Sequence, residues 1–99
     1  MSIPTVTAME AQAEASLFLS DRLPDRLSAS APFLDEAAQS WHVPVILAYP
    51  HIGVLGQVGE IIVGAAKAEV ISSTPVEEML KTAQALAEKH RDAIEAPLP

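Results

Sequence analysis

Apolar positions predict a helix near the start of the chain. Thr7 and Glu10 stand three residues apart, as in a capping box, where each side chain accepts a hydrogen bond from the other residue's backbone N–H. We therefore expect a helix over residues 8–22. Its apolar residues recur at helical spacing, and they are Ala8, Ala11, Ala15, Phe18 and Leu19.

A second helical pattern predicts a helix over residues 75–94. Thr74, Pro75 and Glu77 occupy the positions expected of an N-cap, a first-turn proline and a capping-box partner. The apolar stripe that follows is spaced for one face of a helix. Its residues are Val76, Met79, Leu80, Ala83, Leu86, Ala87, His90 and Ile94.

Between the helices, residues 43–49, 57–63 and 68–72 have the composition of strands, with a turn over 64–67. Residues 43–49 are apolar at both parities, so the strand needs cover on both of its faces. Pro44 has no N–H to donate, so its N–H side should face a sheet edge or a bulge.

Residues 28–32 indicate a loop, and residues 33–41 admit two interpretations. Asp35 to Gln39 favour a helix by propensity, whereas a short strand near Phe33 followed by a turn would supply a hairpin partner for the next strand. We prefer the strand and turn. The sequence thus predicts an α+β fold in a single domain over 1–99, with loose termini at 1–6 and 95–99. Its core is an antiparallel meander of three to four strands, packed on an N-terminal helix and followed by a C-terminal helix.

The composition of the chain excludes some classes of binding partner. The chain of 99 residues is 49% hydrophobic and 4% aromatic, with a net charge of −7 and no cysteine. Phosphate groups and anionic membranes require basic surfaces, so neither nucleic acid nor membrane is an expected partner. A mean hydropathy of +0.25 in so small a chain predicts exposed apolar surface. We expect a homodimer, with a basic protein as a further possible partner.

The N-terminal residues have neither the basic nor the apolar region of a signal peptide. The longest apolar run, residues 43–49, is far shorter than the ~20 residues of a membrane span. We therefore expect a cytoplasmic protein.

Groups that could carry catalysis are scattered along the chain. His42 and His51 flank one strand and would lie roughly 25–30 Å apart, so they cannot share a metal ion. No serine stands in a Gly-x-Ser-x-Gly elbow. Residues 53–59 carry three glycines but lack the Gly-Lys-Ser/Thr ending of a phosphate loop, and they favour a mobile connection instead. We predict no catalytic residue, no metal and no cofactor, and hence no enzyme activity.

One aromatic cluster is a candidate partner-binding surface. Trp41, Tyr49 and His51 include the only tryptophan and the only tyrosine of the chain, and these two residue types are enriched at binding hot spots. The alternative for Trp41 is that it closes one end of the core.

Residues 59–71 resemble the terminal hairpin of PepSY-type domains, and Trp41 with Val43 and Val45 resembles the preceding strand of such domains. The pattern of that family has an Asp, a Thr and a Gly in the turn, where this chain has Gly64, Lys67 and Ala68. The resemblance covers roughly residues 8–72 and implies a cystatin-like body in which a sheet packs on a helix.

Three functions are compatible with the sequence. The first is a small, non-catalytic protein-binding or regulatory module, favoured by small size, acidity and the missing catalytic groups. The second is a homo-oligomeric structural protein. The third is a ligand-binding cup of cystatin-like type, with its cavity between sheet and helix. It ranks last because the residues expected to face inward are almost all aliphatic.

Overall fold

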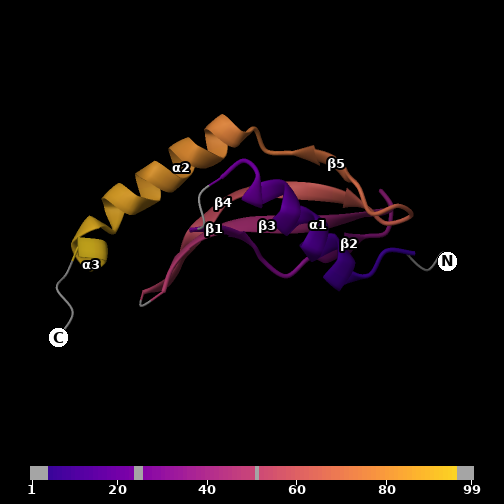
Figure 1. Cartoon of the computed structure of the whole chain (residues 1–99), viewed down its shortest axis with the longest axis horizontal. Coiled ribbons are helices and arrows are strands. Elements are labelled where there is room, and N and C mark those ends of the chain that lie inside the picture. The colour runs from indigo at the N-terminus through magenta and orange to yellow at the C-terminus, as the bar shows by residue number, and fades with distance from the viewer. Residues whose placement is uncertain (1–4, 24–25, 51, 96–99) are drawn as a thin grey trace.

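The computed structural model describes residues 5–23, 26–50 and 52–95. It confirms the predicted α+β fold, with an N-terminal helix, a curled antiparallel sheet and C-terminal helices (Figure 1). In chain order the elements are α1 (Ala8–Ser20), β1 (Leu27–Ala29), β2 (Phe33–Asp35), β3 (Ser40–Tyr49), β4 (Gly53–Gly64), β5 (Val70–Ser73), α2 (Val76–Lys89) and α3 (Arg91–Glu95).

The sheet is built around the long β3–β4 hairpin. Its order is β1-β3-β4-β5, and β2 pairs with the same edge of β3 as β1 does. The backbone of Pro44 faces this edge where the chain passes from β1 to β2, and its carbonyl accepts a hydrogen bond from the N–H of Ser30. The missing N–H of Pro44 therefore falls at an interruption of the ladder, as the sequence predicts.

Both helices cover the same face of the sheet. Val43 and Val45 of β3 are fully buried in one core with Ala15 of α1. Residues directly opposite each other in an antiparallel pair point to the same side, and Gly59 is opposite Val45. Because a Cβ on Gly59 would touch Met79, α2 lies on that side too.

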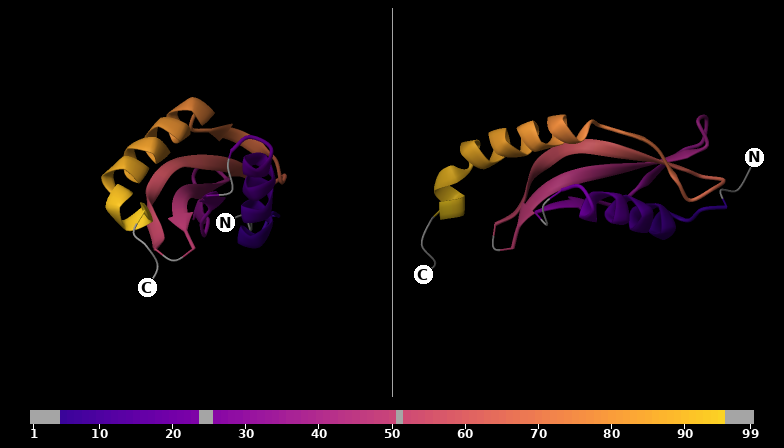
Figure 2. Two further views of the ribbon diagram at one scale, coloured as in Figure 1. Left: turned by 60° about the vertical axis from the view of Figure 1, so that its left-hand side comes forward. Right: turned by 45° about the horizontal axis from the view of Figure 1, so that its top comes forward.

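The two helices follow different directions because the β3–β4 hairpin is long and twisted. Adjacent strands rotate progressively along a sheet, so the same face turns as the hairpin extends. Figure 1 shows α1 in front of the sheet and α2 along its upper left, and Figure 2 shows the curl of the sheet between them. The result is an elongated molecule with extents of 52 × 27 × 22 Å.

Two extra residues in β4 set the spacing of its glycines. The register with β3 shifts twice, at Val58 and at Leu55, so three residues of β4 match two of β3. Glycines at every third position therefore all point to the covered face. The resulting pairs are Gly59 with Val45, Gly56 with Leu47 and Gly53 with Tyr49.

Gly59 and Gly56 form the seat of α2, whereas a Cβ on Gly53 would have no neighbour within 4 Å. A Cβ on Gly59 would lie 2.6 Å from Cγ of Met79, and one on Gly56 would lie 3.1 Å from a methyl carbon of Leu86. Met79 and Leu86 are seven residues apart, or two turns of helix, so one stripe of α2 rests on both glycines. The prediction of a mobile connection over 53–59 is therefore wrong over its described residues, which form strand.

Several predicted bounds also change. The loop predicted over 28–32 contains the end of β1, and the return strand is 70–73 in place of 68–72. The first helix ends at Ser20, and the last helix is interrupted at His90, which divides it into α2 and α3.

Thr74 does not cap α2. Its hydroxyl accepts a hydrogen bond from the N–H of Glu60 at 3.0 Å, its N–H donates to the Glu60 carbonyl, and the N-cap residue is Pro75. Thr74 thus extends the contact between the chain after β5 and β4, which is a tertiary role that no local pattern encodes.

Three local predictions are confirmed. The capping box of Thr7 and Glu10 is present, and residues 33–41 form strand, turn and strand. Trp41 takes part in the core, and its Nε1 donates to the carbonyl of Val6 at 2.8 Å. Val6 is itself buried and donates its N–H to Ala65, so the leader predicted to be loose over 1–6 is fixed at this residue.

Candidate binding surface

None of the helices formed by the described residues covers the second face of the sheet. His42, Pro44, Ile46 and Ala48 of β3 point away from α1 and α2, and all four side chains stay half-buried, whereas Val43, Val45 and Leu47 on the covered face are buried. We call this uncovered side the open face. The sequence predicted that both faces of this strand are covered, whereas the helices of the described residues cover only one of them.

The open face carries several exposed apolar side chains, together with polar ones such as Ser28 and Gln57, which lie beside Ile46. Ile62 of β4 lies beside His42 in the register, and Val54 lies opposite Ala48 with 61% of its surface exposed. Phe33 lies opposite His42 with 54% exposed. Ile71 is 59% exposed, and its side chain approaches the position that a Cβ of Gly64 would take on this side. Exposed apolar residues gathered on one surface mark sites of association more reliably than residues scattered singly.

A polar cluster occupies one end of the open face. The Nε2 atom of His42 lies 3.3 Å from Oδ2 of Asp35, and its Nδ1 atom lies 3.1 Å from Oε1 of Glu60. The ring of Phe33 stacks on the imidazole, with centroids 5.0 Å apart and 13° between the planes. A doubly protonated imidazole donates to both carboxylates, whereas a neutral ring donates to only one.

This cluster is not arranged as a metal site. The two carboxylates contact different nitrogens of the ring, so the three side chains do not converge on a common point. Across residues 5–23, 26–50 and 52–95, no group of three or more His, Asp or Glu side chains could hold a metal ion. The same residues contain no helix with the length and apolarity needed to cross a membrane.

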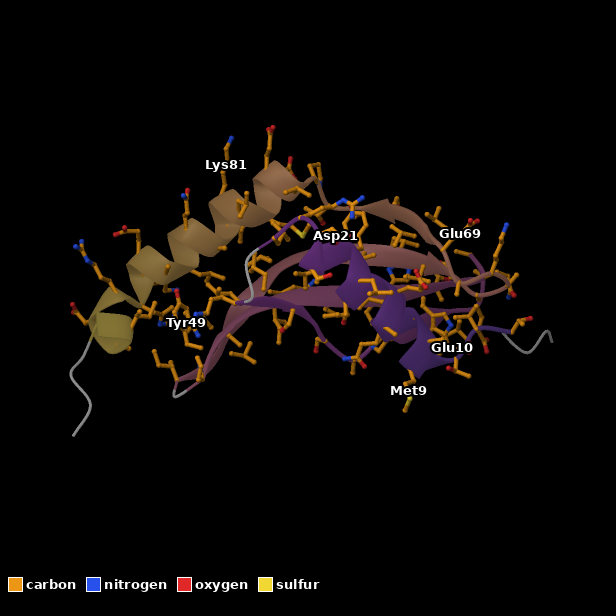
Figure 3. All side chains as sticks on the ribbon, viewed as in Figure 1. Met9, Glu10, Asp21, Tyr49, Glu69 and Lys81 are labelled. Carbon is orange, nitrogen blue, oxygen red and sulfur yellow. The ribbon has the colours of Figure 1, made fainter. Side chains whose placement is uncertain are left out.

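The structure separates the residues predicted to bind a partner. Trp41 and Tyr49 point to the covered face at the two ends of β3, eight residues or roughly 26 Å apart. Tyr49 lies near the α2–α3 end of the molecule (Figure 3). His51 is outside the described residues. Trp41 and Tyr49 therefore do not form one patch.

No family model, no curated protein and no solved structure matches this chain. The resemblance to PepSY-type domains thus stays a prediction.

Only one feature of the sequence indicated the open face, and most residues of this surface were not predicted to belong to it. The apolar residues at both parities of 43–49 indicated two faces that need cover. Phe33, Asp35, Glu60 and Ile71 were missed as members of the surface because the sheet register brings them beside His42 and Ile62, and these two paired residues are themselves twenty positions apart.

Proposed function

We propose that this protein is a non-catalytic binding module that associates with a second copy of itself through the open face. The observation that carries the proposal is the contrast between the two sides of β3, one sealed by both helices and one apolar and uncovered. A homodimer with twofold symmetry buries the same patch on both partners. Two sheets can pack face to face with their strands about 30° apart, as in a β-sandwich.

The polar cluster can lie at the rim of such an interface. Charged groups that are buried in an interface carry a large desolvation cost unless they are paired. The imidazole of His42 can neutralise at most one of the two carboxylates that contact it, those of Asp35 and Glu60. Because the cluster occupies one end of the open face, association can cover the apolar part of the face while these three side chains stay in contact with water.

The size of the open face predicts a weak dimer. The ten residues of β3 span about 33 Å, and three spacings between four strand positions add about 14 Å of width, which gives roughly 500 Å² per copy. Two copies would bury roughly 1,000 Å² in total, close to the lower limit for a specific interface. We expect a dimer that forms in the micromolar range and dissociates on dilution.

Analytical ultracentrifugation from low to high micromolar concentration tests the proposal. The mass of the wild-type protein should rise toward that of a dimer. Ile46→Glu and Ile62→Glu each place a charge on the open face, and both variants should stay monomeric with an unchanged circular dichroism spectrum.

Leu17→Glu is the matched control, because Leu17 is 62% exposed on α1, away from the open face. It should dimerise as the wild type does. A wild-type protein that is monomeric at high micromolar concentration would overturn the proposal. A dimer that is lost in Leu17→Glu and kept in Ile46→Glu would overturn it as well.

A further inference from the structure

A groove lies on the covered side of the sheet, where α1 has ended and α2 leans over β4. Its volume is about 320 Å³. The floor includes Leu27 of β1 and Leu47 of β3, and one wall consists of Leu80, Ala83 and Ala87 of α2. Leu80 is 37% exposed, and the two alanines are too small to close the space between helix and sheet. The groove is therefore open to solvent, and its lining is apolar apart from Gln84 of α2 and the residues at its rim.

A positively charged side chain, that of Arg26, lies at the rim of this groove. The guanidinium carbon of Arg26 lies 4.8 Å from the centroid of the Tyr49 ring, and both residues line the groove. Stacking on an aromatic ring orients a guanidinium while leaving its N–H groups able to bind an anion. Among the described residues, no carboxylate forms an ion pair with Arg26. Arg26 is thus a positively charged residue beside an apolar groove, in a chain whose net charge is −7.

We propose that the groove binds a medium-chain fatty acid, with its carboxylate on Arg26 and its hydrocarbon chain between Leu47 and α2. Leu80 and Ala87 are seven residues apart, or about 10 Å along the helix axis, which matches an extended chain of about eight carbons. Arg is suited to carboxylates because its N–H groups can donate to both oxygens at once. The groove faces away from the open face, so this site does not depend on self-association.

The chain also offers a matched control for the cation. Arg22 is stacked on Phe18 with its guanidinium carbon 4.0 Å from the ring centroid, yet Arg22 does not line this groove. Arg22→Gln and Arg26→Gln therefore remove the same charge and the same kind of ring contact at two exposed positions, of which only one borders the proposed site.

An NMR titration with sodium octanoate tests the proposal, with 1-octanol as the uncharged probe of equal chain length. Octanoate should shift the amide resonances of Leu47, Tyr49 and residues 80–87, and octanol should bind more weakly. Arg26→Gln should weaken octanoate binding about tenfold, the size expected for loss of a charged hydrogen bond. Arg22→Gln should bind as the wild type does.

A second variant tests the hydrocarbon site. Ala83→Leu should fill the groove and reduce the binding of both probes, while its circular dichroism spectrum stays unchanged. Equal affinity of wild type and Arg26→Gln for octanoate would overturn the role of the cation. Shifts confined to residues of the open face, or unchanged binding in Ala83→Leu, would overturn the site.

Discussion

Gly59 marks a very close approach between the sheet and α2. A Cβ at this position would lie 2.8 Å from Sδ of Met79 and 3.0 Å from Cβ of Thr74, and Met79 is fully buried. Because Met79 is fully buried and the nearest contact is with its Cγ, close to the helix backbone, Gly59→Ala should reduce the free energy of unfolding by about 1–3 kcal/mol. Urea denaturation measures this loss.

Gly56→Ala is the comparison for that experiment. Its Cβ would meet the end of Leu86, which is only partly buried and can rotate away. We expect a smaller loss than at Gly59. Equal stability of Gly59→Ala and the wild type would contradict the close packing of α2 on β4.

The capping box gives the protein a pH-dependent contribution to stability. The N–H of Thr7 donates to Oε1 of Glu10 at 2.9 Å, and the N–H of Glu10 donates to the Thr7 hydroxyl at 3.1 Å. The hydrogen bond from the Thr7 backbone, followed by that with its side chain, lowers the pKa of Glu10 below its ordinary value of 4.5. A lowered pKa stabilises the fold above pH 4.5, and this contribution is lost as the pH falls through the pKa of the folded state.

Glu10→Gln separates the charge from the hydrogen bond, since glutamine still accepts from the Thr7 N–H. The wild type should be the more stable protein at about pH 7, and the difference should be smaller at about pH 3, since the contribution of the carboxylate is lost as the pH falls through the lowered pKa of Glu10. Urea midpoints at the two pH values measure it. A difference that stays constant with pH would contradict the assigned role of the carboxylate.

The two threonines that precede helices show what a local pattern can predict. At Thr7 the donor and acceptor lie three residues apart, so the sequence alone predicts the hydrogen bonds. Thr74 has an equally suitable context, but its hydroxyl binds the N–H of Glu60, fourteen residues away. The competing partner comes from the sheet register, which no capping rule includes.

At the scale of elements, α2 is held mainly at its beginning. Met79 is its only buried residue among those described, and Val76, Ala83 and Leu86 are only partly buried against the core. A helix in water owes most of its stability to packing of its apolar face. The end of α2 and the short α3 should therefore open locally far more often than β3 and β4.

Native-state hydrogen exchange measures this gradient. Amide protection should be highest in β3 and β4, lower near Met79 and lowest from Lys89 to Glu95. Gly59→Ala should reduce protection throughout α2 and leave β3 less affected. Equal protection along the whole of α2 would show that it is anchored at both ends.

The irregular register of β4 explains why residues 53–56 were not predicted to form a strand. Strand patterns are recognised by a period of two, because side chains alternate between faces. In β4 the extra residues at Val58 and Leu55 give the covered face a period of three. Residues 53–56 therefore lack the alternation that identifies a strand, and their glycines favoured the prediction of a connection. β3 has no such insertion and was predicted correctly over 43–49.

At the scale of the whole molecule, the chain is more extended than a typical domain. Its Cα radius of gyration is 14.9 Å, against about 13 Å for a compact domain of this length. The sequence predicted the α+β class and, apart from β1 and the division of the last helix into α2 and α3, the order of elements, because these follow from local periodicity. It did not predict that α1 and α2 share one face, since an apolar stripe shows that a helix packs without showing on which side of a sheet.

The elongated shape distinguishes modes of dimerisation in solution. If two open faces pack with their strands about 30° apart, the dimer thickens while its length stays close to that of the monomer. Small-angle X-ray scattering should then show a maximum dimension well short of twice the 52 Å length of one chain. Ile46→Glu supplies the monomer profile. A maximum dimension near twice the monomer length would indicate end-to-end association and contradict pairing through the open face.

The glycine seat of α2 also implies that this architecture can be lengthened in units. Each unit consists of two residues in β3, three in β4 with glycine last, and two turns of α2, because Gly59 and Gly56 lie under Met79 and Leu86, which are seven residues apart. Adding one unit to all three elements together would keep the same side chains on the covered face and create one more glycine under the helix. Adding an odd number of residues to β3 alone would carry the inward side chains beyond the insertion to the opposite face. Longer ribbons of this kind are thus expected to need insertions in all three elements together, a rule that designed variants can test.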